Sequence, residues 1–225
     1  MTFSLAARCS QTGMLGVAIA SSSICVASRC PWVRSGVGAS TTQNVTDPSL
    51  GNLMLNYLEE GLNVQEAIDK IIENNKFINY RQLSLIDAKG NSASFTGSKI
   101  LGRHAVSKEV DCIAIGNLLS STNVINSMTD NFKKNSNVHF IERLLLALQA
   151  GVDSGGEEGP IHSAGIKVAH ENSWPLVDLR IDWTENNPVA ELIELWNTYK
   201  PQMEDYKSRA TNPDKAPSYG VPGDL

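Results

Sequence analysis

Hydrophobic positions along this 225-residue chain follow two spacings. Short segments rich in small and β-branched residues, bounded by turn residues, predict strands. The chain is predicted to open with a β-hairpin whose strands, Thr2–Cys9 and Met14–Ala20, flank a Ser-Gln-Thr-Gly turn. The same criteria predict further strands over Trp32–Gln43, Arg81–Asp87, Ser92–Thr96, Val110–Ile115, Ile161–Ala169 and Trp174–Asp182.

Apolar residues spaced three and four apart predict the helices. Asp47 and Pro48 are typical of a helix start, and Gly61 of its end. Asn63 is predicted to cap a second helix that immediately follows. Three more helices are predicted at about Ser121–Lys134, Val138–Val152 and Val189–Tyr199.

The order of elements is strands, two helices, strands, two helices, a hairpin and a helix. Antiparallel blocks separated by helix pairs predict an α+β fold built in layers, rather than a doubly wound parallel sheet. No repeat or linker divides the chain, so residues 1–225 are predicted to form a single domain with a Pro-rich tail from about residue 200.

Composition narrows the possible functions. The formal net charge is −5 and no basic run exceeds Lys133-Lys134, which argues against nucleic-acid binding. No apolar stretch reaches the roughly 20 residues that a membrane-spanning helix needs. The four cysteines form no C-x-x-C pair, so reduced thiols, no metal site and a cytoplasmic protein are expected.

None of the common catalytic motifs is present: no G-x-S-x-G, H-E-x-x-H or phosphate-binding glycine loop. No cofactor is therefore expected. The suggestive residue is Thr2, because removal of Met1 would leave it with a free α-amine of reference pKa about 7.7–8.0. Such an amine can take the proton from the hydroxyl of the same residue and activate it. On spacing alone, a purely structural threonine in a strand is the more common explanation of Thr2.

Other polar residues are candidates for substrate binding or catalysis. Ser22 could hold a carbonyl group, Arg34 a carboxylate, and Asn117 an oxyanion. Gln43, where a predicted strand leads into the following helix, is a further candidate, and so is His162 at the start of another strand. Turn, surface and packing roles remain open for each of these residues.

Three acidic residues and a cysteine complete the list of candidates. Asp178 shares a strand face with Arg180, so an ion-pair network is the first interpretation and substrate binding the second. Glu157 and Glu158 lie in a glycine-rich loop and are expected to be solvated. Cys30 is an alternative nucleophile, although buried inert thiols are more common.

Several segments together resemble the bacterial family known as domain of unknown function 1028. They include TFSLAARCSQTGMLGVAIASS, RCPWVRSGVGASTTQNVTDPSLG, GGEEGPIHSAG, DLRIDW and the SYGVPGD ending. Members of that family resemble N-terminal nucleophile (Ntn) hydrolases. The resemblance implies a four-layer αββα sandwich of two antiparallel sheets, with Thr2 in the position of the nucleophile. The lysine that proteasome-like relatives place near the nucleophile has no counterpart before Lys70.

The prediction is a cofactor-free amidohydrolase that acts on a small polar amide or cyclic amide, a C–N bond other than a peptide bond. Thr2 would attack the carbonyl, Asn117 would hold the oxyanion, and Arg34 and His162 would orient the substrate. One alternative is a hydrolase of the same fold with another nucleophile or a water activated by His162. Another is a non-enzymatic small-molecule binding protein. The tail aromatics also predict a homodimer: Trp196, Tyr199, Tyr206 and Tyr219. Folding of the tail back onto its own domain is an equal alternative.

Overall fold

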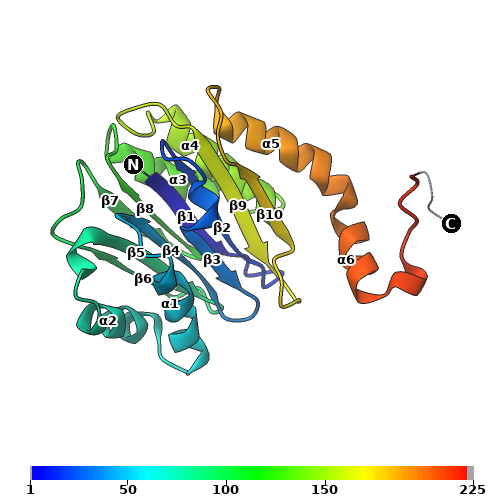
Figure 1. Cartoon of the computed structure of the whole chain (residues 1–225), viewed down its shortest axis with the longest axis horizontal. Coiled ribbons are helices and arrows are strands. Elements are labelled where there is room, and N and C mark those ends of the chain that lie inside the picture. The colour runs from blue at the N-terminus through cyan, green and yellow to red at the C-terminus, as the bar shows by residue number, and fades with distance from the viewer. Residues whose placement is uncertain (1, 222–225) are drawn as a thin grey trace.

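Two antiparallel sheets lie face to face in the computed structural model, which describes residues 2–221 (Figure 1). The larger sheet has six strands in the order β10-β9-β2-β1-β8-β7, so the first strand of the chain is central. Its strands are β1 (Thr2–Arg8), β2 (Leu15–Ser21), β7 (Ala105–Glu109), β8 (Cys112–Asn117), β9 (Ser163–Ala169) and β10 (Val177–Ile181).

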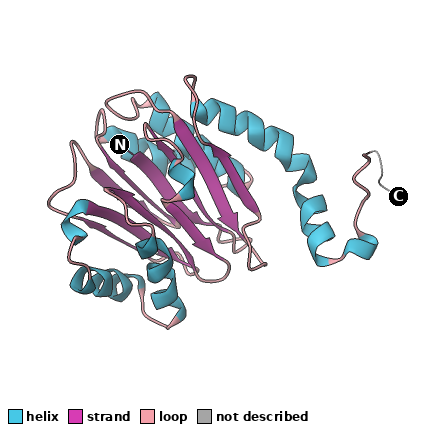
Figure 2. Ribbon diagram, in the orientation of Figure 1, coloured by secondary structure: helices cyan, strands magenta, loops and turns pink. Residues whose placement is uncertain are grey.

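The smaller sheet has the order β3-β4-β5-β6, and helices cover the outer face of each sheet (Figure 2). Its strands are β3 (Pro31–Arg34), β4 (Gly38–Asn44), β5 (Arg81–Asp87) and β6 (Ser92–Thr96). Helices α1 (Ser49–Glu59) and α2 (Val64–Asn74) pack on this sheet. Helices α3 (Asn123–Lys134), α4 (Phe140–Asp153) and α5 (Pro188–Tyr199) pack on the larger one. The four-layer αββα sandwich predicted from the sequence is confirmed.

Alternation along the strands divides the apolar residues among three cores. In β1, Phe3, Leu5 and Ala7 face the α3–α4 layer, whereas Ala6 faces the second sheet. Thr2 and Ser4 share the face of Ala6 because side chains two apart point the same way. The first residue of β1 therefore points between the two sheets.

One predicted strand is two strands in the structure. The segment Trp32–Gln43 reverses at Gly36, whose φ of +69° is open to glycine and strained for most other residues, so β3 and β4 form a hairpin. At Gly38 the backbone of β5 comes close, since a Cβ there would lie 2.5 Å from the Ile86 carbonyl oxygen.

Among the strands and α-helices of the described residues, β7 and α6 (Met203–Thr211) were not predicted. Strand β7 carries no hydrophobic run and exists because it pairs along β8 at the edge of the sheet. Helix α6 lies in the tail, whose polar, Pro-rich composition does not favour a helix. The Asn63 cap is confirmed: its side chain accepts from the Gln65 and Glu66 backbone N–H groups, and Glu66 reciprocates in a capping box.

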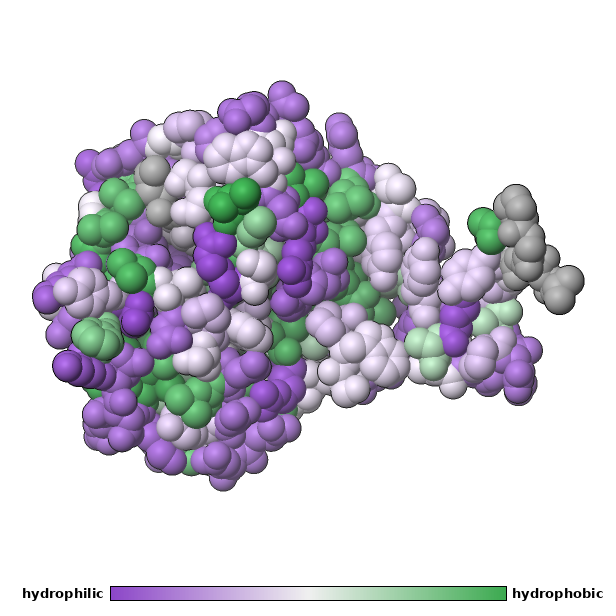
Figure 3. Space-filling model, in the orientation of Figure 1, coloured by the Kyte–Doolittle hydropathy of each residue, from purple (hydrophilic) through white to green (hydrophobic). Residues whose placement is uncertain are grey.

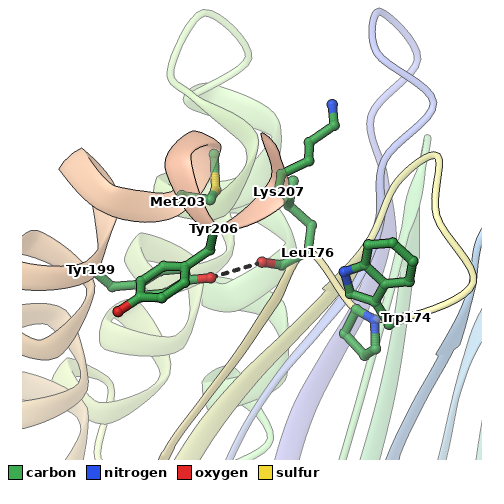
Figure 4. Close-up of a pocket in the computed structure, with 7 residues that line it drawn as sticks. Trp174, Leu176, Tyr199, Met203, Tyr206 and Lys207 are labelled. Carbon is green, nitrogen blue, oxygen red and sulfur yellow. Dashed lines mark hydrogen bonds between the residues drawn. The ribbon is translucent and has the colours of Figure 1, made fainter. Parts of the chain in front are cut away.

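The C-terminal arm, α6 and the residues up to 221, projects from the end of α5 and away from the sheets (Figure 1, Figure 3). Tyr206 stacks on Tyr199 with the ring centroids 6.0 Å apart, and Tyr219 meets Tyr206 edge-on at 6.4 Å. A groove of about 280 Å³ lies at the base of the arm, where the Tyr199 hydroxyl donates to the Leu176 carbonyl at 3.3 Å (Figure 4). Tyr206, Tyr219 and Trp174 remain exposed.

The predicted homodimer has not been tested by these observations and stays a prediction. We expect light scattering at micromolar concentration to give twice the 24.4 kDa mass of one chain, because association would cover the exposed arm aromatics. Replacing Tyr206 and Tyr219 by serine should give a monomer, and the control Thr211→Ala should not. A monomeric wild-type protein would contradict the prediction.

Close approach of β4 to β5 generates a stability prediction. Gly38→Ala should lower the free energy of unfolding by about 1–3 kcal/mol, because the added methyl group meets a backbone oxygen that cannot rotate away. The control is Gly36→Asn, at a turn position with open space, where asparagine tolerates a positive φ. Urea denaturation compares the two variants, and equal stability of both would show that the sheet adjusts.

Candidate functional site

The layer between the two sheets changes character along its length. Over most of its extent it is apolar, with Ala6, Val17, Ile19 and Ile115 among its buried residues. At the end where β1 begins, the residues buried there are instead polar: Thr2, Ser4, Ser21, Gln43, Gln82 and Asn117. We call these six residues the inter-sheet polar cluster. Burying so many polar groups is unfavourable unless they are hydrogen-bonded.

Two glutamines connect the sheets within this cluster. The Ser4 hydroxyl donates to Gln43 Oε1 at 2.9 Å. Gln43 Nε2 donates to Gln82 Oε1 at 3.0 Å and to the Thr2 carbonyl oxygen at 3.4 Å. The smaller sheet therefore holds the main chain of the first residue of β1 directly. Gln43, predicted from the sequence as a binding residue, supports Thr2 in the structure.

A backbone carbonyl fixes the orientation of the amides. Gln82 Nε2 lies 3.0 Å from the Gly116 carbonyl oxygen, which can only accept, so Gln82 Oε1 must point the other way. Asn117 Nδ2 donates to Gln82 Oε1 at 3.1 Å. Asn117 Oδ1 is thereby left as an acceptor, buried and without a partner among residues 2–221. This orientation differs from the role of oxyanion donor that the sequence predicts for Asn117.

Serines at the end of β2 meet Thr2. Ser21 Oγ lies 3.2 Å from Thr2 Oγ1, within hydrogen-bond distance. The next residue, Ser22, donates its backbone N–H to Glu157 Oε2 at 3.1 Å. Ser21 and Ser22, the second of which is a candidate from the sequence, thus lie between the Thr2 hydroxyl and a carboxyl group.

Glu157 corrects an expectation from the sequence, which placed it in solvent. Only 5% of the residue is exposed. Gly155 and Gly156, with φ values of +109° and +56°, turn the loop after α4 toward the sheet, and Glu157 forms a β-bridge with Leu119. The neighbouring Glu158 faces outward, as expected, with 51% of its side chain exposed.

Burial raises the pKa of the Glu157 carboxyl to about 7. The Ser22 hydrogen bond and the proximity of His162 act in the opposite direction but do not cancel the effect of burial. Glu157 therefore exchanges a proton near neutral pH, which is a property typical of functional sites.

His162 lies at the edge of the same region. Its backbone N–H donates to the Ser21 carbonyl at 2.9 Å, and its ring stacks on Trp183 with centroids 4.3 Å apart. His162 Nδ1 lies 2.8 Å from the Thr184 carbonyl oxygen, an acceptor, so this nitrogen carries the hydrogen. In the neutral ring, Nε2 then holds the lone pair that a general base needs.

Two predicted residues lie apart from the cluster. Arg34 is at the far end of the β3–β4 ladder from Gln43, and its guanidinium pairs with Glu59 at 2.5 Å. Asp178 pairs with Arg180 at 2.7 Å and with Lys167 at 3.4 Å, the ion-pair network that was its first interpretation. Burial raises the pKa of the Cys30 thiol to about 11, which disfavours it as a nucleophile.

Cavities described on the molecule lie elsewhere. They have volumes of about 170–470 Å³, and Thr2, itself 5% exposed, lines none of these five. Among residues 2–221, no three His, Cys, Asp or Glu side chains are grouped so as to hold a metal ion. Within the same residues, each helix is too short or too polar to cross a bilayer.

Sequence reasoning found Thr2, Ser22, Gln43, Asn117 and His162 of this region and missed the rest. Ser4 and Gln82 had a usable signal, since polar residues at alternate positions of an otherwise apolar strand indicate a polar patch on one face. For Glu157 there was no usable sequence signal, because a loop has no periodicity that would distinguish Glu157 from the adjacent Glu158.

Comparison with known proteins gives a family and a related structure. The model of DUF1028, a family of unknown function, matches residues 2–192. The crystal structure of protein SPO2555 from Silicibacter pomeroyi, assigned to the same family model, is 32% identical. The match has a TM-score of 0.82 and covers 88% of this chain and 89% of that one. The resemblance inferred from the sequence is confirmed.

More distant matches include Anbu, an ancestral β-subunit, from two bacteria. The Yersinia bercovieri protein is 13% identical with a TM-score of 0.39, covering 91% of this chain and 97% of that one. The protein from Hyphomicrobium sp. strain MC1 is 11% identical, also with a TM-score of 0.39, covering 97% and 100%. No curated protein matches the chain.

The raised pKa of Glu157 generates a prediction for stability. Between about pH 4.5 and pH 7 the folded protein keeps this proton while the unfolded chain loses it, so stability falls as the pH rises through that range. In the wild type we expect the free energy of unfolding to decline by an amount on the order of 1–3 kcal/mol over this range, and we expect Glu157→Gln to lack this decline. Urea denaturation at pH 5 and pH 8 measures it.

The exposed neighbour provides the control. Glu158→Gln changes the net charge by the same amount but removes no buried carboxyl, so its stability should decline with pH as in the wild type. Identical pH dependence of the Glu157→Gln variant and the wild type would show that Glu157 does not titrate in this range.

Proposed function

We propose a hydrolase function for this chain, which belongs to the family of unknown function DUF1028, with Thr2 as the nucleophile that attacks a small polar amide. The observation that carries the proposal is the inter-sheet polar cluster. It buries polar groups around the first residue of a central strand, at the end of a layer that is otherwise apolar. Strand pairing and packing alone do not require this arrangement.

The chemical steps use groups that belong to Thr2 itself once Met1 has been removed. Thr2 Oγ1 forms a bond to the amide carbonyl carbon while its proton passes to the α-amine. The C–N bond then breaks, and the amine returns that proton to the leaving nitrogen. Water hydrolyses the ester that remains and frees the Thr2 hydroxyl. Met1 lies outside the described residues, and its removal belongs to the proposal.

The surroundings of Thr2 support this assignment. Gln43 holds the Thr2 carbonyl oxygen, and the pairing of β1 with β2 and β8 fixes the main chain on both sides. Ser21 Oγ, at 3.2 Å, can orient the hydroxyl for attack. A nucleophile held this rigidly loses little entropy on reaching the reactive geometry.

A second candidate keeps the hydrolase and replaces the nucleophile. It is favoured by the hydrogen bond from His162 Nδ1 to Thr184, which leaves Nε2 as the basic nitrogen of a neutral ring. In that version His162 activates water, and the amino group of Thr2 takes no part. A cytoplasmic location, the absence of a cofactor and the identity of the amide all stay predictions under either version.

Substitution of Thr2 tests the first candidate. Against a panel of small linear and cyclic amides, we expect Thr2→Ala to lose at least about 10³-fold in turnover, since no nucleophile remains. Thr2→Ser should retain activity. The control, Thr198→Ala on the exposed side of α5, should match the wild type. Intact mass measured on each protein shows whether Met1 has been removed.

Other outcomes separate the alternatives. Unchanged turnover in Thr2→Ala combined with a loss in His162→Ala would replace the first candidate by the second. Tight ligands that shift the melting temperature and are never consumed would favour a non-enzymatic binding protein.

A further inference from the structure

Two buried acceptors near Thr2 lack hydrogen-bond partners. Glu157 Oε2 accepts from Ser22, but Glu157 Oε1 has no partner among residues 2–221, and the same holds for Asn117 Oδ1. A buried polar atom without a hydrogen-bond partner is unfavourable, and a charged one more so. Two acceptors without partners in one region are suited to a shared donor with several N–H groups.

Both acceptors belong to segments that surround the start of β1. Asn117 is the register partner of Thr2 in the β1–β8 ladder. Leu119, two residues further along, bridges to Glu157. Ser22, which binds the Glu157 carboxyl, follows Ser21, whose hydroxyl lies 3.2 Å from that of Thr2. The main chain thus brings Asn117 and Glu157 to the same end of β1 from two different elements.

We propose that Glu157 is a positioning residue for the α-amine of a mature Thr2, which donates N–H groups to Glu157 Oε1 and to Asn117 Oδ1. This rests on the proposed function only in taking Thr2 as the first residue. The orientation of Asn117 supports it, because the Gly116 carbonyl fixes its oxygen, and not its N–H₂, as the available atom. A pair of acceptors suits an ammonium group, which has three donors and no acceptor.

Such a contact places the amine and also controls its proton. A carboxylate at hydrogen-bond distance favours the ammonium form, whereas burial favours the uncharged forms of both groups. Burial brings the pKa of Glu157 to about 7, and the reference pKa of an α-amine is about 7.7–8.0, so the two groups compete for one proton near neutral pH. The amine can then be neutral, as a general base must be, while it stays hydrogen-bonded to Glu157 and Asn117.

A titration that needs no substrate tests the proposal. Full-length protein that starts at Thr2, verified by intact mass, is labelled with ¹³C-threonine, and the Thr2 Cα signal is followed by NMR from pH 5 to pH 10. We expect the midpoint to fall by about one pH unit or more in Glu157→Gln, because the ammonium loses its counter-charge. The control Glu158→Gln, at the adjacent exposed position, should keep the wild-type midpoint.

Equal midpoints in Glu157→Gln and wild type would overturn the proposal. If the Gln variant does not fold, Glu157→Asp tests the same contact: its shorter side chain withdraws the carboxylate, so a midpoint below that of the wild type supports the proposal and an unchanged one contradicts it. A protein without amidase activity would remove the proposed function and leave this measurement intact. In an active enzyme, the acid limb of the pH–rate profile should move with the midpoint.

Discussion

The hydrogen bond between Gln82 and the Gly116 carbonyl is the interaction on which the polar end of the sandwich depends. A backbone carbonyl oxygen can only accept hydrogen bonds, so the nitrogen end of the Gln82 amide must face it. Gln82 then decides the orientation of Gln43 and Asn117, both of which donate to its oxygen. Through Gln43 the same chain of bonds reaches the Thr2 carbonyl oxygen. Loss of this one bond would leave several buried amides without a defined orientation.

This network also explains why Thr2, the first residue of β1, has a fixed position. Terminal residues are usually poorly ordered, unless a sheet holds them. Here β1 lies between β2 and β8 inside the larger sheet, and the smaller sheet contacts it through Ser4 and Gln43. The cost is a layer in which polar groups replace hydrophobic contacts. Natural sequences accept such a local inconsistency mainly at functional sites.

The loop after α4 contributes the only acidic side chain that we find buried in this region of the described structure. Two glycines with positive φ bring Glu157 into contact with Ser22 and Leu119, which follow β2 and β8. Burial makes Glu157 a proton-exchanging group near neutral pH. The adjacent Glu158 shows what the same residue type does when the backbone turns it outward: it forms a long surface ion pair with Arg103 at 3.9 Å. Position along the turn, and not residue type, separates the two carboxyl groups.

The sequence by itself determined the layers, most of the elements and several residues of the site. Period-2 and helical patterns are local, so the opening hairpin, the Asn63-capped helix and the α3–α4 pair could be read directly from the chain. The turn at Gly36 was missed because a glycine in a β-prone segment indicates a bend and a close contact alike. Only the tertiary structure decided that Gln43 links Gln82 to Thr2, that Arg34 lies away from them, and that Glu157 is buried. Each of these depends on which distant strands become neighbours, and that is settled by the packing of the whole core, which no local pattern encodes.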